Sequence, residues 1–294
     1  MHPSVRHTFV RRSCCIAAAL FVATLAACGG DDGGLVIGGP LPELPGRPGP
    51  ADPPPAQAAC RPQGNVTYSG SAAQVAPRNG TLAVVVMPSL PRDYQRGRDF
   101  TAPEAPAASQ VQQPGGAFTT LASSAAAGDC LGIEHGMVTE IQGIGSDVAI
   151  GRWIRAKDTD GNTYTEVQGV HYAVGTPLAL PARAGTLACT QRLADTVSVG
   201  NGGNSGTLLD TTSATLDLGT RTLNDLVLTV RMSDGEHTLT QARAPLNGVA
   251  TGGALAVQTV VVGHDASEPM VALGYSATLP NGNEAGGVAV LSCR

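Results

Sequence analysis

The sequence predicts an all-β fold: a small soluble antiparallel β-barrel of about eight strands, preceded by a β-rich segment and by a disordered stalk rich in proline and glycine. Segments in which apolar and polar residues alternate recur about every 8–15 residues after Gly64, the pattern of half-buried strands. Turn-forming pairs such as Asp234-Gly235 and Asn281-Gly282 separate these segments and favour tight hairpins. Helical periodicity is almost absent, so the folded body is predicted to be built from antiparallel strands.

The N-terminus is predicted to be a targeting signal and not part of the fold. Three arginines precede an apolar stretch that is too short to span a membrane as a permanent helix. The stretch ends in LAAC (Leu25–Cys28), which resembles the bacterial lipobox L-[AS]-[GA]-C. The resemblance implies a signal peptide over residues 1–27, a diacylglycerol on the thiol of Cys28 and a membrane anchor. Gly29, where aspartate would signal inner-membrane retention, favours the outer membrane.

Residues 28–64 are predicted to be the lipidated cysteine followed by a linker. Nine prolines and nine glycines occupy positions 29–64. This composition cannot bury a core and favours an extended, polyproline-like chain. At about 3.1 Å per residue, such a stalk reaches about 100 Å, so it would hold a folded body clear of the lipid surface.

Residues 65–146 are predicted to form a β-rich segment. It begins with a strand over Thr81–Met87 (TLAVVVM), and one short helix is expected over Ala117–Ala127. Between them, residues 88–116 are predicted to be a long loop rich in proline and glutamine. This loop is the candidate contact surface, and an unstructured excursion is the alternative. The side chains that favour contact with a partner are Arg92, Tyr94, Arg96 and Arg98.

Residues 147–294 are predicted to form the barrel. Within Ser213–Leu218, for example, every second residue is apolar, so one face of the strand is predicted to be buried and the other to be exposed to solvent. Regular short strands joined by tight turns favour a sandwich or a closed barrel. The expected strands are Asp147–Lys157, Asn162–Val174, Gly185–Thr190, Ser213–Leu218, Arg221–Met232, Glu236–Arg243, Ala254–Gly263, Met270–Leu279 and Gly287–Ser292, after Met137–Gln142 in the preceding segment.

Five motifs punctuate this segment. They are GRWIRA (Gly151–Ala156), VHYAVGTP (Val170–Pro177), LPARAGTLACT (Leu180–Thr190), GTLLDTTSATLDLGTRTL (Gly206–Leu223) and NEAGGVAVLS (Asn283–Ser292). Together they resemble the β-barrel of transferrin-binding-protein-B-like surface lipoproteins. Cys189 and Leu218 depart from the pattern, standing where tyrosine and phenylalanine are common. The resemblance implies a barrel and a surface location. It implies no ligand, because nothing matches the transferrin-contacting loops.

The cysteines predict two disulfides. Outside the signal and the lipobox, Cys60, Cys130, Cys189 and Cys293 remain, and an even count in an exported chain indicates paired thiols. Three pairings are possible. A four-cysteine zinc site is disfavoured because no C-x₂-C spacing occurs. The barrel resemblance implies that the first and last strands meet, which favours Cys189–Cys293 and leaves Cys60–Cys130.

No catalytic residue is predicted. Ser205 lies in GNSG (Gly203–Gly206), which is similar to the nucleophile turn of chymotrypsin-like proteases. Neither His135 nor His171 lies in the setting that a catalytic base has in those enzymes. Thr207 replaces the last glycine of a G-x-S-x-G nucleophile elbow. A flexible loop between strands is therefore expected at Ser205.

No metal or cofactor site is predicted. Asp158, Asp160 and Asn162 stand at alternate positions in DTDGNT, a spacing that calcium loops use, but Thr163 stands where the EF-hand glycine belongs. A hairpin turn explains this segment without a metal. The histidines show no metal-ligand spacing. The single tryptophan, Trp153, is expected to pack in the core, with an exposed binding aromatic as the alternative.

Net charge and composition make some classes of function less plausible than others. The 294 residues carry a net charge of −5 and no basic cluster beyond the N-terminus, so binding to nucleic acid is disfavoured. We predict a non-enzymatic binding protein that is held on the membrane by its N-terminal lipid. Its ligand, a protein or a small molecule, is not identified by the sequence. It would lie at the cell surface or in the periplasm. A structural or assembly lipoprotein facing the periplasm is the alternative, and an enzyme is the third hypothesis.

Overall fold

The computed structural model describes residues 60–90 and 98–294, which all lie in one compact unit, Ala51–Arg294. Apart from one 3₁₀ turn, η2 (Ala107–Ser109), the regular structure of these residues is strand, so the all-β prediction is confirmed. No helix in this part of the chain is long and apolar enough to cross a membrane. The predicted signal peptide with Cys28, the linker up to residue 59, and the loop residues Arg92, Tyr94 and Arg96 lie outside the described residues.

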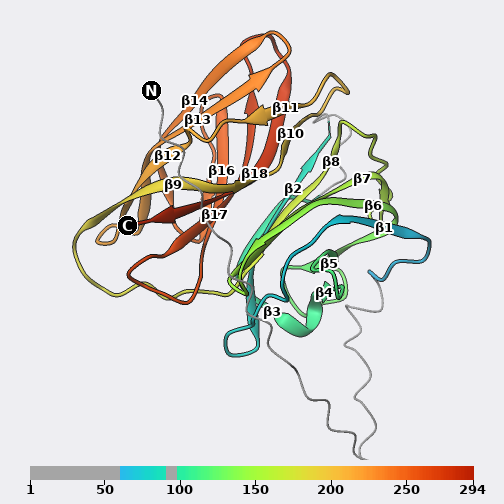
Figure 1. Ribbon diagram of the computed structural model, residues 1–294, viewed down its shortest axis with the longest axis horizontal. Helices are drawn as coiled ribbons and strands as arrows, with labels where there is room; N and C mark the ends of the chain where they lie inside the picture. Colours follow the sequence, from blue (N-terminus) through green and yellow to red (C-terminus); the bar gives the residue numbers. More distant parts are fainter. Residues whose placement is uncertain (1–59, 91–97) are drawn as a thin grey trace, which may run out of the picture. The chain divides into compact units, whose positions relative to one another are not determined.

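The first eight strands form one sheet, coloured blue to yellow-green in Figure 1. Its order is β3-β2-β8-β7-β6-β5-β4, and β1 pairs in parallel with β6. All the other pairs in this sheet are antiparallel. The strands are β1 (Val66–Gly70), β2 (Thr81–Ser89), β3 (Phe100–Pro106), β4 (Val111–Gln112), β5 (Phe118–Ala122), β6 (Cys130–Ile144), β7 (Val148–Asp158) and β8 (Gly169–Gly175).

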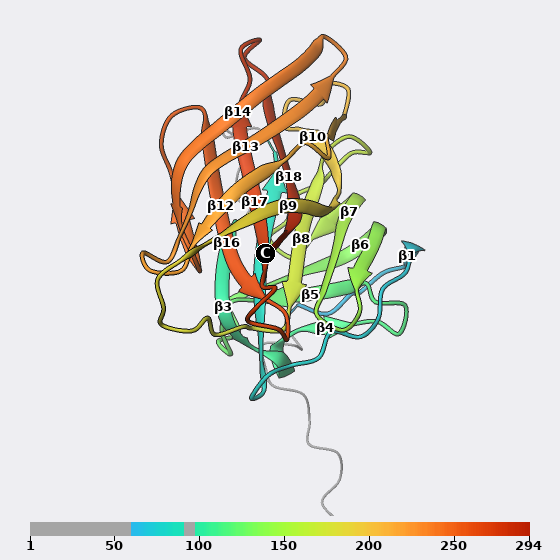
Figure 2. The ribbon, with the colours of Figure 1, turned by 60° about the vertical axis from the view of Figure 1, so that its left-hand side comes forward.

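The remaining ten strands form a second sheet that curls on itself (Figure 2). Its order is β10-β11-β13-β12-β9-β18-β17-β16-β15, with β14 paired to β13. Because β10 also pairs with β18, six of these strands close into a ring of hydrogen-bonded neighbours. The strands are β9 (Thr186–Ala194), β10 (Thr196–Val199), β11 (Gly206–Leu208), β12 (Ser213–Asp217), β13 (Thr222–Met232), β14 (Gly235–Pro245), β15 (Gly248–Ala250), β16 (Leu255–Val262), β17 (Met270–Thr278) and β18 (Glu284–Cys293).

The curled sheet begins at Thr186, whereas the sequence placed the start of the barrel at residue 147. β7 and β8, which carry the GRWIRA and VHYAVGTP motifs, pair with β6, with each other and with β2 in the first sheet. Their large side chains explain this placement. Trp153 and Tyr172 are fully buried in the core of the first sheet, and Trp153 Nε1 donates a hydrogen bond to the carbonyl oxygen of Phe118 at 2.9 Å. Trp153 is therefore a core residue.

Two predictions for the segment 65–146 are wrong. The expected loop 88–116 contains β3 and β4, and β3 pairs with β2. Its prolines are compatible with pairing because β3 is an edge strand of the sheet. The expected helix at Ala117–Ala127 is replaced by β5, whose residues are all buried. Burial of Phe118 and Leu121 against the first core outweighs the helix propensity of the alanines around them.

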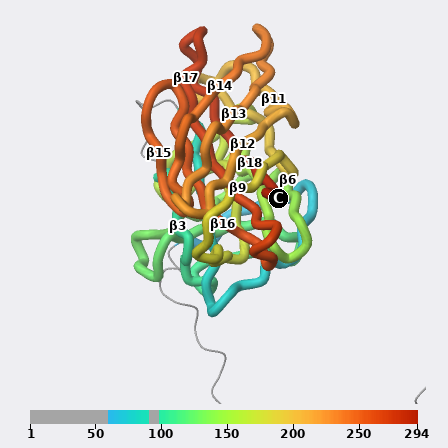
Figure 3. Tube along the Cα trace, turned by 90° about the vertical axis from the view of Figure 1, so that its left-hand side faces the viewer, coloured from blue at the N-terminus to red at the C-terminus, as the bar shows by residue number. Residues whose placement is uncertain are grey.

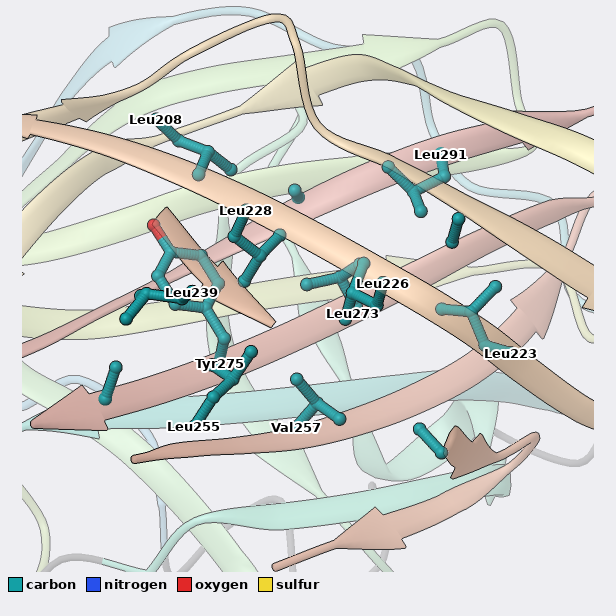
Figure 4. Close-up of a cluster of buried hydrophobic side chains, with 14 of the residues drawn as sticks. Leu208, Leu223, Leu226, Leu228, Leu239, Leu255, Val257, Leu273, Tyr275 and Leu291 are labelled. Atoms are coloured by element: carbon teal, nitrogen blue, oxygen red, sulfur yellow. The ribbon is translucent and has the colours of Figure 1, made fainter. Parts of the chain in front are cut away.

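Buried apolar side chains form one core inside each sheet and a third layer between the sheets. The core of the curled sheet is leucine-rich, as Figure 4 shows. The third layer joins side chains of β2, β7 and β8, such as Val85 and Ile150, to those of β16, β17 and β18, such as Val262 and Val288. Gly274 in β17 permits this close contact, because a Cβ there would lie 2.4 Å from Cγ of Met87. The two sheets therefore pack face to face.

Two buried disulfides link the described residues, one at each sheet. Cys60–Cys130 ties the start of the described chain to β6, with the Cα atoms 6.1 Å apart. Cys189–Cys293 joins β9 to β18 at positions that face each other in the ladder, with the Cα atoms 4.0 Å apart. These are the pairs that the barrel resemblance favours. The C-terminus directly follows β18, and the backbone N–H of Arg294 donates a hydrogen bond to the carbonyl oxygen of Ala188 in β9 at 2.9 Å.

Two hairpin tips meet at one end of the curled sheet. Asn281 Nδ2, in the turn between β17 and β18, donates a hydrogen bond to Asp234 Oδ2 in the turn between β13 and β14, at 2.6 Å. Figure 3 shows both tips at this end. Asn201 Nδ2 donates to Asn283 Oδ1 at 2.7 Å, so the loop before β11 joins the same group.

Candidate functional site

A pocket of about 390 Å³ lies where the ends of the two sheets face each other. Met87–Leu90, at the end of β2, form one wall. Ser276 of β17 and Gly286 of β18, which are paired in the ladder, form the opposite wall. The turn at residues 251–254, before β16, lines a third side. The pocket is thus assembled from both sheets.

The pocket is lined by apolar side chains and by polar groups, two of which are acidic. Asp99 and Glu284 supply the two carboxylates, and Asp99 is exposed. Gln258, which is buried, donates a hydrogen bond from Nε2 to Asp99 Oδ2 at 2.6 Å. The Oε1 atom of Gln258 accepts a hydrogen bond from Thr101 Oγ1 at 2.5 Å. These bonds fix the orientation of the Asp99 carboxylate.

Beside the pocket, a cluster of buried polar side chains lies between the sheets. His171 Nδ1 is hydrogen-bonded to Asp195 Oδ2, and both side chains are fully buried. Asp195 Oδ1 accepts a hydrogen bond from the backbone N–H of Val288 at 2.9 Å. Desolvation raises the pKa of the Asp195 carboxyl, while the imidazole of His171 opposes this shift. Burial and the charge of Asp195 together raise the pKa of the Tyr275 hydroxyl.

A second pair, formed by the buried Arg152 and the half-buried Glu140, lies next to the first. Arg152 faces His171 in the β7–β8 ladder, and its Nη2 contacts Glu140 Oε1 at 2.9 Å. Arg152 Nη1 donates to Ser198 Oγ at 3.1 Å, and Glu140 Oε2 accepts from the backbone N–H of Thr196 at 2.6 Å. Both of these bonds cross from the first sheet to β10. Glu140 adopts a φ of 54° at a β-bulge, a conformation that redirects a side chain out of the regular alternation.

The cluster adjoins the pocket through strand pairing. Met87, a pocket residue, faces His171 across the β2–β8 ladder, and Gly286, another pocket residue, faces Ser198 across the β10–β18 ladder. Three buried atoms of this region have no hydrogen-bond partner among the described residues: His171 Nε2, Arg152 Nε and the Tyr275 hydroxyl. Unpartnered buried polar atoms are costly and rare.

The structure does not bring the serine and histidine candidates together. Ser205 is exposed in the turn before β11, and no hydrogen bond within the described chain joins it to His135, which is exposed, or to His171. A histidine oriented by an aspartate also occurs in catalytic triads. In this structure the His171–Asp195 pair is sealed between the sheets, where it connects β8 to the segment between β9 and β10.

The DTDGNT segment forms a hairpin turn. Asp158 is fully buried and accepts hydrogen bonds from the backbone N–H of Asn162 at 2.9 Å and from the Tyr164 hydroxyl at 2.7 Å. Asp160 instead pairs with Arg98 at 3.0 Å. Within residues 60–90 and 98–294, no group of three or more potential metal ligands was found. Arg98, expected on the contact loop, therefore anchors that segment to the hairpin.

The sequence analysis missed Asp99, Glu140, Arg152, Asp195 and Glu284. For two of these residues the sequence indicated a buried charge. Arg152 interrupts an apolar strand, and Asp195 stands between two strands with apolar inner faces. A charged residue at a core-facing position needs a buried partner, because an unpaired buried charge is strongly destabilising. The identity of the partners could not be read from the sequence, since they come from four different strands or connections.

Comparison with known proteins gives one distant structural likeness. No family model matches the chain, and no curated protein matches it. Among solved structures, the chain is similar to a tryptophan-to-alanine mutant of the vaccine antigen transferrin-binding protein B from Haemophilus parasuis Hp5, with a TM-score of 0.34 and 12% sequence identity. The match covers 72% of this chain and 44% of that chain, so this chain spans less than half the length of that protein. A likeness of this degree assigns neither a ligand nor an activity.

Proposed function

We propose that this chain is a non-enzymatic binding protein of the bacterial cell envelope, with its ligand site in the pocket between the two sheets. The observation that carries the proposal is the pocket itself, with a volume of about 390 Å³ and a lining in which apolar side chains and polar groups contribute in similar measure. Small-molecule sites are typically concave and formed before the ligand arrives, with volumes of about 300–1,000 Å³ and a few polar groups that fix the ligand's orientation.

The surroundings of the pocket favour a preformed site. The apolar layer between the sheets and the pairs His171–Asp195 and Arg152–Glu140 fix the two walls relative to each other. A site held by packed strands loses little conformational entropy when a ligand binds. The pocket therefore combines the size of a ligand site with the rigidity that binding requires.

The proposed location rests on the N-terminal sequence. The LAAC motif at Leu25–Cys28 and the proline- and glycine-rich stretch after it are those of a lipid-anchored protein with a stalk. Replacing Cys28 with alanine removes the thiol that would carry the lipid. We expect the Cys28→Ala chain to leave the membrane fraction and the unaltered chain to stay in it, as measured by immunoblotting of fractionated cells.

Brief protease treatment of intact cells then shows which side of the outer membrane the anchored body occupies. Degradation in intact cells would place it at the cell surface. Protection until the outer membrane is opened would place it in the periplasm, where the alternative, an assembly role, becomes the better proposal. Equal membrane retention of the Cys28→Ala and unaltered chains would contradict the lipid anchor.

A bulky side chain at Ala256 tests the pocket. Ala256 is a half-buried lining residue, so the Ala256→Phe variant is expected to fill part of the cavity and to abolish ligand binding. We would screen polar and amphipathic small molecules against the full chain and measure the free energy of unfolding. A ligand at 100 times its dissociation constant stabilises a protein by about 2.7 kcal/mol.

The matched control is Ala242→Phe, at an exposed position of β14 outside the pocket. The control should keep the stabilisation by the ligand, and the Ala256→Phe variant should lose it while remaining folded. If both variants bind the ligand like the unaltered chain, the pocket is not the ligand site.

A further inference from the structure

The described residues that line the pocket carry charge of one sign. Asp99 and Glu284 are the charged side chains among them, and none of these residues is a lysine, an arginine or a histidine. The chain as a whole is only mildly acidic, at a net charge of −5 for 294 residues. A concave site lined by one sign of charge attracts ligands of the opposite sign. The described lining residues therefore favour a cation at Asp99.

Asp99 has a free acceptor atom at a fixed position. Its Oδ2 atom accepts the hydrogen bond from Gln258 Nε2, and its Oδ1 atom accepts none from the described residues. Because Gln258 is buried and bonded in turn to Thr101, the carboxylate is oriented before a ligand arrives. A preoriented carboxylate binds an ammonium group through charge-assisted hydrogen bonds, which are stronger than neutral ones.

Part of the lining is apolar and does not suit an ion that is polar throughout. Met87, Leu90 and Ala256 contribute apolar side chains to the walls. The hydroxyl of Ser89 is already bonded to Gly169, to its carbonyl oxygen at 3.0 Å and to its N–H at 2.8 Å. A small metal ion or a polyamine would leave the apolar walls uncovered, whereas an aliphatic or aromatic chain would cover them.

We propose that the pocket binds an organic ammonium ion that bears an apolar chain. The ammonium head lies at Asp99, and the chain lies against Met87 and Leu90. This inference rests on the proposed function, since it names the chemical class of the ligand for the same pocket. The ligand is bound without a covalent bond. The Asp99 carboxylate binds its ammonium group, and the apolar side chains of the pocket contact its apolar chain.

Three probes of equal chain length separate charge from apolar contact: octylammonium, 1-octanol and octanoate. Each would be titrated into the full chain at low ionic strength and followed by calorimetry. Octylammonium is expected to bind most tightly and octanoate most weakly. Shortening the ammonium probe to hexylammonium should weaken binding about fourfold for each methylene group removed.

Asp99→Asn is the variant that tests the charge. Asparagine keeps an oxygen that can accept the bond from Gln258, so the wall should stay intact. Because Asp99 is exposed, the ion pair is expected to supply up to about a fivefold gain in affinity, and the variant should lose this gain for octylammonium while binding 1-octanol unchanged. The control Asp210→Asn makes the same change in charge at an exposed site outside the pocket and should alter neither affinity.

The outcomes separate this inference from the proposed function. If 1-octanol or octanoate binds as tightly as octylammonium, and Ala256→Phe abolishes that binding, the pocket is a ligand site and the ammonium class is wrong. An octylammonium affinity that Asp99→Asn leaves unchanged also overturns the ammonium class. If none of the probes binds, or if Ala256→Phe binds them like the unaltered chain, both the ammonium class and the proposal that this pocket is the ligand site are wrong.

Discussion

Replacing Asp195 with alanine is expected to lower the free energy of unfolding by about 3–5 kcal/mol, because it removes the hydrogen-bond partner of two buried polar groups. The change leaves His171 Nδ1 sealed between the sheets with no acceptor or donor opposite it, and it leaves the N–H of Val288 without its acceptor. Each unpartnered buried group costs its full desolvation. Urea unfolding of the full chain, followed by tryptophan fluorescence of Trp153, measures the loss.

Two control variants show whether pairing causes the loss. Asp195→Asn keeps an acceptor for Val288 and a donor for an unprotonated His171, so it should cost no more than about 2 kcal/mol. Asp210→Ala, at an exposed position, should change the stability by less than about 0.5 kcal/mol. If Asp195→Ala is as mild as Asp210→Ala, the pair does not hold the sheets together.

Comparison with the asparagine variant also predicts how the free energy of unfolding depends on pH. Burial raises the pKa of the Asp195 carboxyl above its ordinary value of 3.8, so the folded chain keeps this proton where the unfolded chain has released it. The folded state then binds more protons, and stability falls as the pH rises. Relative to Asp195→Asn, the unaltered chain should be most stable below pH 3.8 and should lose stability as the pH rises through the folded-state pKa. A gain in relative stability over that range would contradict the burial argument.

The strands that the sequence predicted best are those with clear alternation or a compact apolar run. The strands expected over Thr81–Met87, Ser213–Leu218 and Met270–Leu279 correspond to β2, β12 and β17. β12 buries one face, and β2 and β17 are buried on both faces over most of their length. β3 escaped prediction because its prolines are typical of loops, and only its place at the sheet edge makes them acceptable. β5 escaped because helix propensity is a local property, whereas burial of Phe118 depends on strands far away in the chain.

The candidate site was harder to predict than the fold because its residues are distant in the sequence and meet only in the tertiary structure. Asp99 and Gln258 are 159 residues apart in the sequence, and only the packing of the two sheets brings them together. The sequence showed only that His171 lacks the setting of a catalytic base, and the structure buries it beside Asp195. A charged residue in an apolar segment indicates that a buried partner exists, but its identity follows only from sheet topology.

Removing the Cys189–Cys293 disulfide, by the double change to alanine, is expected to lower the free energy of unfolding by about 4–5 kcal/mol. The bond closes a loop with a sequence separation of 104 residues, so its loss restores much conformational freedom to the unfolded chain. It also joins the two strands at the seam of the curled sheet, where the backbones of Ala188 and Arg294 exchange hydrogen bonds at 2.9 Å. Chemical unfolding of the oxidised chain and of the variant measures the difference.

The Cys60–Cys130 pair supplies the matched comparison, since its sequence separation of 70 residues is similar. In the chain-entropy model the two losses should differ by less than about 0.5 kcal/mol, because the entropy depends on the logarithm of loop length. Any larger loss at Cys189–Cys293 would therefore come from the native state. It would show that the short ladder between β9 and β18 needs the covalent bond to keep the sheet curled. A loss below about 2 kcal/mol at Cys189–Cys293 would show instead that the core of the curled sheet holds this seam without the disulfide.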